Sequence, residues 1–197
     1  QSSGRGRRRI RALVLTPTRE LAAQVAESVS CYGKYLPLTS AVVFGGVKIN
    51  PQIQRLRQGV DILVATPGRL LDHVSQGTVD LSQLEILVLD EADHMLDLGF
   101  INALRKIAAM LPATRQTMLC SATMPKQMNE IANAYLQSPI RVQVSPPGKA
   151  ADKVTQEVHF IAKGEKTGLL IELLAKHKGE RALVFGRTKH GCEKLMK

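Results

Sequence analysis

The chain has 197 residues, of which 44% are hydrophobic and 22% are charged, a composition typical of a globular protein with one domain and part of a second. No apolar run approaches the roughly 20 residues of a membrane-spanning helix, and the basic, polar start lacks the apolar stretch of a secretory signal peptide, so we expect no membrane segment. The net charge of +10 favours an anionic partner, most simply a nucleic acid.

Residues 1–9 are rich in glycine, serine and arginine, and we predict that they form a flexible basic segment. A solvated loop is favoured over a dedicated RNA-binding arm, although the composition allows both. Because the chain begins with Gln1 and ends at Lys197 inside a predicted helix, we expect an internal piece of a longer protein.

A short apolar run followed by a turn and a helical periodicity then recurs along the chain. The predicted strands are residues 12–15, 41–44, 62–65, 86–89, 118–120 and 140–144, and the predicted helices are residues 18–33, 50–58, 67–76, 100–110 and 125–136. Strands that alternate with helices imply βαβ units and a mostly parallel sheet, and continuous apolar strands imply that both faces of the sheet are covered. We assign residues 10–144 to this α/β domain.

Two prolines and a glycine within residues 145–149 interrupt the pattern and predict a linker over residues 145–153. Beyond it we predict a strand over residues 154–162, a helix over residues 164–178 and a strand over residues 182–185. Residues 154–197 therefore read as the truncated start of a second α/β domain.

The predicted strand at residues 86–89 runs directly into Asp90, Glu91 and Asp93. In an open parallel sheet, ligands bind beyond the carboxyl ends of the strands. Carboxylates at that place can hold Mg²⁺, usually through water, and can orient an attacking water, so Asp90 is placed to serve a metal and Glu91 a water. The same residues could instead cap a helix and complement its dipole, and taken alone they favour neither role.

Two other predicted strands are each followed by a Thr-Pro-x-Arg turn, namely Thr16-Pro17-Thr18-Arg19 and Thr66-Pro67-Gly68-Arg69. Threonine suits an N-cap and proline the first helical position. An arginine in the first turn opposes the helix dipole by roughly 0.3–1 kcal/mol, and a bound anion would remove that conflict. The turns therefore predict two phosphate-binding sites on one face of the domain, although Glu20 can partly offset Arg19.

Two short polar motifs follow further strands. Gly45-Gly46 permits positive φ and the close approach of another backbone, but on its own a plain tight turn is the simpler interpretation. Ser121-Ala122-Thr123 precedes Pro125, and its hydroxyls would cap the next helix. Each motif is a weak signal alone, whereas their order and spacing are specific.

In that order and spacing the chain resembles the DEAD-box RNA helicases, through Pro17-Thr18-Arg19-Glu20-Leu21-Ala22, Gly45-Gly46, Thr66-Pro67-Gly68-Arg69, Asp90-Glu91-Ala92-Asp93 and Ser121-Ala122-Thr123. Residues 184–189 resemble the first motif of that family's second RecA-like domain. The resemblance covers nearly the whole chain after Arg9. Residues 43–47 and 188–191 are similar to the bacterial RhlE-type subgroup.

The resemblance implies a RecA-like parallel sheet with flanking helices, followed by the start of a second RecA-like domain. It implies an ATP-dependent RNA helicase that uses ATP and Mg²⁺ to unwind short RNA duplexes and remodel RNA. Asp90 would hold Mg²⁺ through water, and Glu91 would position and activate the hydrolytic water. Asp93 would join Ser121 and Thr123 in the network that links hydrolysis to RNA release.

The resemblance also implies contacts to the sugar-phosphate backbone of single-stranded or locally duplex RNA, made by Pro17, Thr18, Arg19, Gly45, Gly46, Thr66, Pro67, Gly68 and Arg69. Backbone contacts carry little sequence information, which suits a non-specific grip on RNA. We further expect a cytoplasmic protein, with ribosome or RNA-decay assemblies as possible partners. Three scattered cysteines, Cys31, Cys120 and Cys192, agree with reduced thiols and with no zinc site.

The departures from the family pattern limit this prediction. The 197 residues contain no Gly-x-x-x-x-Gly-Lys-Ser/Thr loop to cradle phosphates, no upstream adenine-reading segment and none of the later arginine-rich motifs. We therefore expect these residues alone to be inactive and to fold poorly, because the phosphate-loop strand is central in the family's sheet. A non-catalytic RNA-binding clamp and a helicase that acts on DNA stay open as alternatives, although the intact acidic and hydroxyl motifs argue against the clamp.

Overall fold

The computed structural model describes residues 8–143 and 154–196. The chain divides into two compact units, residues 1–149 and 150–197, and each is described by itself. The predicted linker at residues 145–153 and most of the predicted basic segment at residues 1–9 lie outside the described residues.

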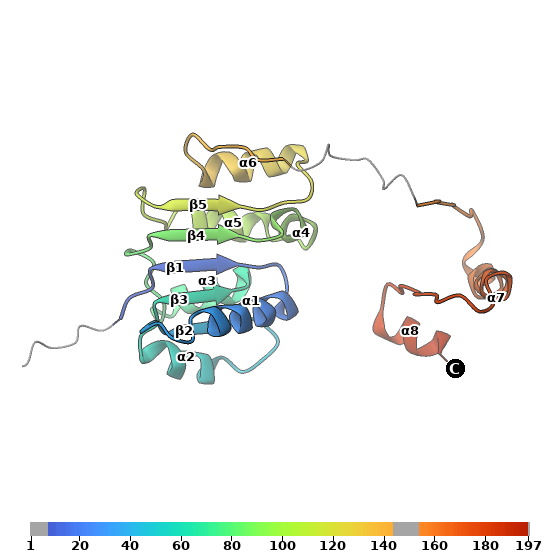
Figure 1. The fold of residues 1–197 in the computed structure, drawn as a ribbon, viewed down its shortest axis with the longest axis horizontal. Coiled ribbons are helices and arrows are strands. Elements are labelled where there is room, and N and C mark those ends of the chain that lie inside the picture. The colour runs from blue at the N-terminus through green and yellow to red at the C-terminus, as the bar shows by residue number, and fades with distance from the viewer. Residues whose placement is uncertain (1–7, 144–153, 197) are drawn as a thin grey trace, which may run out of the picture. The chain divides into compact units, whose positions relative to one another are not determined.

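A five-stranded parallel sheet organises the first unit, in the order β2-β3-β1-β4-β5 (Figure 1). Its strands are β1 (Ala12–Leu15), β2 (Ser40–Val43), β3 (Ile62–Ala65), β4 (Ile86–Leu89) and β5 (Gln116–Leu119). Leu15 at the end of β1 pairs with Ala65 of β3 on one side and with Leu89 of β4 on the other. The carboxyl ends of all strands therefore meet at one edge of the sheet, and the predicted α/β fold class is confirmed.

Helices connect the successive strands, which keeps the strands parallel. They are α1 (Arg19–Tyr32), α2 (Ile49–Arg57), α3 (Pro67–Ser75), α4 (Ala92–Asp97), α5 (Ile101–Ala108) and α6 (Lys126–Tyr135). The core lies on one face of the sheet, where Leu13, Leu63 and Leu87 are fully buried beside residues of α3, α4, α5 and α6. None of the helices in the described parts of the chain combines the length and apolarity that a membrane span requires.

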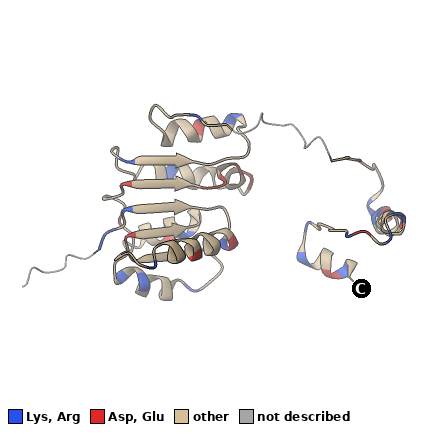
Figure 2. Cartoon of the chain, viewed as in Figure 1, with Lys and Arg blue, Asp and Glu red and all other residues tan. Residues whose placement is uncertain are grey.

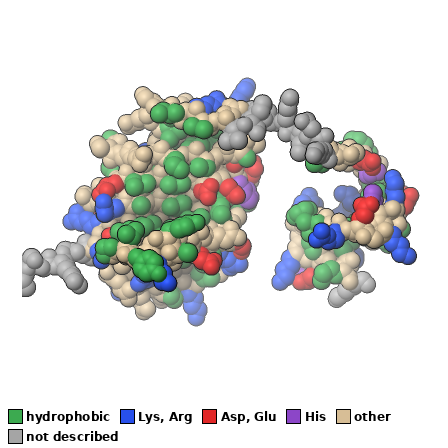
Figure 3. Space-filling view, in the orientation of Figure 1, with side chains coloured by type: hydrophobic (Ala, Val, Ile, Leu, Met, Phe, Trp, Pro, Cys, Tyr) green, Lys and Arg blue, Asp and Glu red, His purple; other side chains and the backbone are tan. Residues whose placement is uncertain are grey.

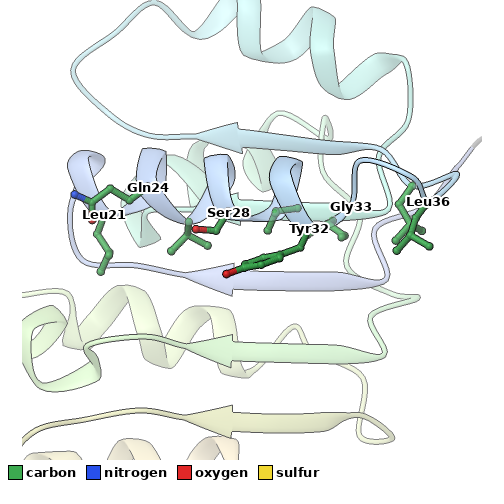
Figure 4. Close-up of a pocket in the computed structure, with 10 residues that line it drawn as sticks. Leu21, Gln24, Ser28, Tyr32, Gly33 and Leu36 are labelled. Carbon is green, nitrogen blue, oxygen red and sulfur yellow. The ribbon is translucent and has the colours of Figure 1, made fainter.

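The opposite face of the sheet is only partly covered, so the prediction that both faces are buried is wrong for residues 8–143. Helix α1 packs over β2 and β3 on this side (Figure 1). On β4 and β5, however, Ile86 is 44% exposed and Met118 is 59% exposed, and Figure 3 shows hydrophobic side chains across this face. An apolar groove of about 530 Å³ runs along α1, lined by residues that include Leu21, Tyr32 and Leu36 (Figure 4).

Other predicted elements differ from the structure. Residues 140–143 form no strand, because no neighbouring strand pairs with them, and α4 was not predicted. In the second unit the predicted helix is present as a short 3₁₀ turn, η1 (Lys163–Glu165), that leads into α7 (Lys166–Lys176), and α8 (Lys189–Leu195) follows. The strands predicted at residues 154–162 and 182–185 are absent, since neither segment has a ladder partner among the described residues.

Candidate functional site

Every residue predicted to be functional lies in a loop that follows one of the five strands or in the first turn of the next helix, and the parallel topology brings these segments to one edge of the sheet. Strand order divides that edge into two halves. Acidic and hydroxyl residues follow the neighbouring strands β4 and β5, whereas the two predicted phosphate-binding turns follow β1 and β3, and the glycine pair follows β2. Figure 2 shows acidic residues beyond the tip of β4, near the start of α4.

Backbone hydrogen bonds hold the acidic segment against the sheet. The Asp90 N–H donates to the Leu15 carbonyl at 2.9 Å, and the Ala92 N–H donates to the Cys120 carbonyl at 3.0 Å. Glu91 between them adopts a left-handed conformation with φ 49° and ψ 52°. A non-glycine residue in that region costs about 1–3 kcal/mol, and such residues cluster at functional sites. This turn leaves the Glu91 side chain exposed at the edge of the sheet.

Asp93 connects the loop after β4 with the loop after β5. Its Oδ2 accepts hydrogen bonds from the Thr123 backbone N–H at 2.9 Å and from Thr123 Oγ1 at 2.8 Å. Ser121 Oγ donates to the Thr123 carbonyl at 2.7 Å. Burial raises the pKa of Asp93, but hydrogen bonds from Thr123, the His94 backbone and Ser121 outweigh it, so the pKa lies below its ordinary value. The structure thus brings together the three residues that were predicted to form one network.

A pocket of about 470 Å³ opens beside these residues and is lined by Asp90, Glu91, Asp93, His94, Asp97, Cys120, Ser121 and Ala122. Three of these residues, His94, Asp97 and Cys120, were not predicted to belong to a site. Nδ1 of His94 lies 3.3 Å from Oε2 of Glu91, a contact that i,i+3 spacing in a helix would have suggested had α4 been predicted. Burial and the charge of Asp90 raise the pKa of the Cys120 thiol, which disfavours a reactive thiolate.

The donor chemistry of this pocket fits Mg²⁺. Carboxylate oxygens are the ligands that this ion prefers, and it is usually held by one or two carboxylates together with water and substrate phosphates. Within residues 8–143 and 154–196, no three His, Cys, Asp or Glu side chains converge as a complete metal cage. An ion bound through one or two carboxylates therefore suits the pocket better than a fully protein-ligated metal.

The other half of the edge is built around the loop that contains Gly45-Gly46. Gly46 has φ 77°, and a Cβ atom at this position would lie 3.7 Å from Nη1 of Arg19. The Arg19 side chain is 53% exposed and pairs with Glu20 at 3.2 Å. Arg19 therefore borders this glycine loop while keeping part of its guanidinium open to solvent.

Arg69 approaches the same loop from the other Thr-Pro-x-Arg turn. Its Nη2 donates to the Val47 carbonyl at 2.9 Å, and its Nε lies 3.4 Å from Oδ2 of Asp72. The side chain is only 11% exposed, and its Nε and Nη1 have no hydrogen-bond partner. Arg69 is thus more deeply buried than Arg19, and it holds the loop as well as offering positive charge.

The two Thr-Pro-x-Arg turns differ in capping, although their sequences predicted the same geometry. In α1 the N-cap is Thr18, whose Oγ1 accepts from the Leu21 N–H at 3.2 Å, so Pro17 precedes the helix. In α3 the N-cap is Thr66, which makes no side-chain capping bond, and Pro67 begins the helix. The buried side chains are those of Pro17, Thr66 and Pro67, and the accessible ones belong to Thr18 and Arg19; Gly45, Gly46 and Gly68 present accessible backbone.

Comparisons with known proteins identify the family of this chain. A model of the family described as DEAD/DEAH box helicase matches residues 3–131. The chain is 39% identical over 187 residues to an ATP-dependent RNA helicase RhlB of Shewanella baltica (strain OS155), covering 94% of this chain and 43% of the relative. It is 38% identical over 194 residues to an ATP-dependent RNA helicase RhlB of Shewanella oneidensis, covering 98% and 44%.

A solved structure shares the fold of about two thirds of the chain. The crystal structure of a hypothetical ATP-dependent RNA helicase from Sulfolobus tokodaii superposes with a TM-score of 0.62 at 43% sequence identity, covering 66% of this chain and 39% of that one. The chain therefore spans less than half the length of the curated relatives it matches.

Proposed function

Because the chain belongs to the DEAD/DEAH box helicase family, we propose that the complete protein is an ATP-dependent RNA helicase. It couples RNA-stimulated ATP hydrolysis to the local unwinding of RNA duplexes and to RNA remodelling. The observation that carries this proposal is the two-part edge of the sheet. An acidic pocket suited to a metal-bound nucleotide lies beside two arginine-bearing turns and a glycine loop suited to a phosphate backbone.

In the acidic half, Asp90 would hold Mg²⁺ through water, and the bound ion would supply positive charge to the phosphates. Glu91 is exposed at the same edge and orients the water that attacks the terminal phosphate. Asp93 joins Thr123 and Ser121, so a shift in the loop after β5 is transmitted to the loop after β4. These contacts support a role in coupling hydrolysis to RNA release.

In the other half, Arg19 and the backbone of Gly45 and Gly46 contact RNA phosphates, with the start of α3 as a second contact. Helix N-termini offer unpaired N–H groups and a favourable dipole to anions. Arg69 contributes mainly by holding Val47 in place. Contacts of this kind read the phosphate backbone and not the bases, so we expect little sequence preference.

The decisive experiment measures ATP turnover by the complete protein with single-stranded RNA, with DNA of the same sequence, and without nucleic acid. We expect strong stimulation by RNA and little by DNA, because contacts to the 2′-hydroxyl distinguish the two. Equal stimulation by DNA would favour the DNA helicase. RNA binding without any turnover would favour a non-catalytic RNA-binding clamp of the same family.

Substituting Arg19→Gln in the complete protein is expected to weaken RNA binding by roughly tenfold to 100-fold, because a charge-assisted contact to phosphate is worth about 1.5–3 kcal/mol. The slope of a plot of log Kd against the logarithm of the salt concentration should also become shallower by about one, because one phosphate contact is lost. Fluorescence anisotropy with a labelled RNA at several salt concentrations measures both. Arg57→Gln removes the same charge from the exposed last turn of α2 and should leave the affinity near wild type; equal weakening by both variants would contradict a specific role for Arg19.

Substituting Thr123→Val removes the hydroxyl that donates to Asp93 while nearly keeping the side chain's shape. We expect duplex unwinding to fall by roughly tenfold, with RNA-stimulated ATP hydrolysis affected much less, because one charge-assisted bond between the two loops is lost. Strand-displacement and ATPase assays on the same preparation give the ratio of the unwinding rate to the ATP hydrolysis rate. Thr114→Val, at an exposed position before β5, is the matched control. An unchanged ratio in Thr123→Val would remove this bond from the coupling path.

The subgroup, the domain division and the place of action are also proposed. Residues 43–47 and 188–191 favour the RhlE-type subgroup, whereas the relatives described above carry the name RhlB, so the subgroup rests on those two stretches alone. We also propose a division of the chain into a partial first RecA-like domain at residues 10–144 and the start of a second at residues 154–197. Action in the cytoplasm, on RNA of ribosome or RNA-decay assemblies, fits the basic charge of the chain.

A further inference from the structure

A buried histidine lies outside the acidic pocket and has no role in the chemistry described so far. His73 is on α3, one helical turn after Arg69, and is 0% exposed. Its Nδ1 lies 2.8 Å from Oγ1 of Thr78, and its Nε2 lies 3.1 Å from Oε1 of Gln52 on α2. Both ring nitrogens are therefore engaged, by elements that are separate in the chain.

Gln52 continues this chain of contacts to the glycine loop. Its Nε2 donates to the Phe44 carbonyl at 3.1 Å, immediately before Gly45. Because this bond uses the amide nitrogen, the amide oxygen faces His73 and has to accept a hydrogen bond from it. The neutral imidazole accordingly carries its proton on Nε2. Nδ1 then has no proton, and it shares the single hydrogen of the Thr78 hydroxyl with the His73 backbone carbonyl, which lies 2.9 Å from Thr78 Oγ1.

The surroundings of His73 favour this neutral form. Burial lowers the pKa of the imidazole, and the positive charge of Arg69 lowers it further, while Asp72 opposes them. A neutral Nε2–H donor toward Gln52 is thus the stable arrangement at neutral pH, and the link to the loop persists there.

The loop from Phe44 to Val47 is consequently held at both ends by side chains whose positions depend on α3. At its far end, Arg69 binds the Val47 carbonyl directly. At its near end, His73 orients Gln52, and Gln52 binds the Phe44 carbonyl. Between these two bonds the loop exposes the backbone of Gly45 and Gly46, and Arg19 borders Gly46.

We propose that His73 is a positioning residue for the RNA-backbone site, which acts through Gln52 to fix the Gly45-Gly46 loop against α3. The inference rests on the proposed function, because it assumes that this loop contacts RNA. His73 does not touch the ligand. Losing its Nε2–H leaves the Gln52 carbonyl oxygen unpaired, frees the amide to rotate, and lets the loop move relative to Arg19.

A matched pair of substitutions in the complete protein tests the link. In His73→Gln the side-chain amide nitrogen takes the place of Nε2 and can still donate to Gln52. In His73→Asn the shorter amide reaches only toward Thr78. We expect His73→Asn to raise the Kd for single-stranded RNA by roughly threefold to tenfold, the equivalent of one net hydrogen bond, and His73→Gln to stay within about twofold.

Two further readouts separate positioning from a general loss of stability. The Kd for a non-hydrolysable ATP analogue should be unchanged in His73→Asn, and in steady-state assays the RNA concentration for half-maximal ATPase should rise while kcat stays near wild type. Thr78→Val breaks the bond on the other side of the ring and should leave RNA affinity within about twofold, because the link to Gln52 remains. If His73→Asn folds poorly, Gln52→Leu, at a half-buried position on α2, tests the same link and should show the same weakening.

The outcomes distinguish this inference from the proposed function. If the wild-type protein binds no RNA, both are overturned. If wild type binds RNA and Arg19→Gln weakens it, but His73→Asn and Gln52→Leu bind normally, the proposed function stands and the role of His73 is overturned. Equal losses in His73→Gln and His73→Asn, or losses that extend to the ATP analogue, would likewise overturn it, since they indicate a residue that only stabilises the fold.

Discussion

Substituting Glu91→Gln in the complete protein is expected to lower RNA-stimulated ATP hydrolysis by roughly 100-fold to 10,000-fold, the range typical of a lost general base. Glutamine keeps the size of the side chain and its left-handed backbone position, but it cannot accept a proton from the attacking water. Nucleotide and RNA binding should persist, because Asp90 and the arginine-bearing half of the edge are unchanged. Steady-state phosphate release with saturating RNA measures the loss.

The control for this prediction is Glu27→Gln, on an exposed position of α1, which removes the same charge without altering the edge of the sheet. It should hydrolyse ATP at the wild-type rate. Turnover by Glu91→Gln within about threefold of wild type would remove Glu91 from its assigned role, because no general base contributes so little. In that case the acidic segment would serve to cap the helix or to bind the metal, and not to activate the water.

The central strands were predicted with the correct bounds, whereas the outer ones were not. The strands at residues 12–15, 62–65 and 86–89 were located without error because their apolar runs are bounded by polar or turn-forming residues on both sides. The outer strands β2 and β5 were displaced by one or two residues. Strand β2 begins with polar Ser40 and β5 with polar Gln116, so an apolar run does not mark where either strand starts. Each has a neighbour on one side only, and exposed positions such as Met118 are tolerated there.

Local conformation at the acidic site was beyond sequence reasoning for a different reason. Helix α4 is only six residues long, too short for its periodicity to stand out, and it starts from the left-handed turn at Glu91. Without that helix, the contact of His94 with Glu91 had no basis in the sequence. The strands predicted in the second unit failed because a strand needs a pairing partner, and strand propensity does not supply one.

The grouping of the site depends on topology. The motifs appear in the chain in the order β1, β2, β3, β4, β5, but the sheet places β1 between β3 and β4. This arrangement puts the arginine-bearing turns after β1 and β3 side by side and sets the acidic half next to them. Contacts between distant residues, such as Arg69 with Val47 and His73 with Gln52, follow from that packing and leave no signal in the sequence.

The 197-residue chain on its own is expected to hydrolyse ATP no faster than background, with or without RNA. Its acidic pocket can hold Mg²⁺ and a water, but catalysis of phosphoryl transfer consists largely of positioning and of neutralising the phosphates. Neither a Gly-x-x-x-x-Gly-Lys-Ser/Thr loop nor its lysine occurs in these residues. Phosphate release by the purified chain at millimolar ATP, with the complete protein as the positive control, measures this.

The same chain should also be only marginally stable, and the reason lies in the sheet. On β4 and β5 the face that carries Ile86 and Met118 is open, although parallel sheets are normally covered on both faces. Strand β5 also ends the sheet with backbone groups that have no neighbour within the described residues. We therefore expect strong binding of a hydrophobic dye and a low urea midpoint relative to the complete protein. If the isolated chain hydrolysed ATP in an RNA-dependent way and Glu91→Gln abolished that turnover, the expected lack of hydrolysis would be contradicted. The acidic half would then suffice for hydrolysis.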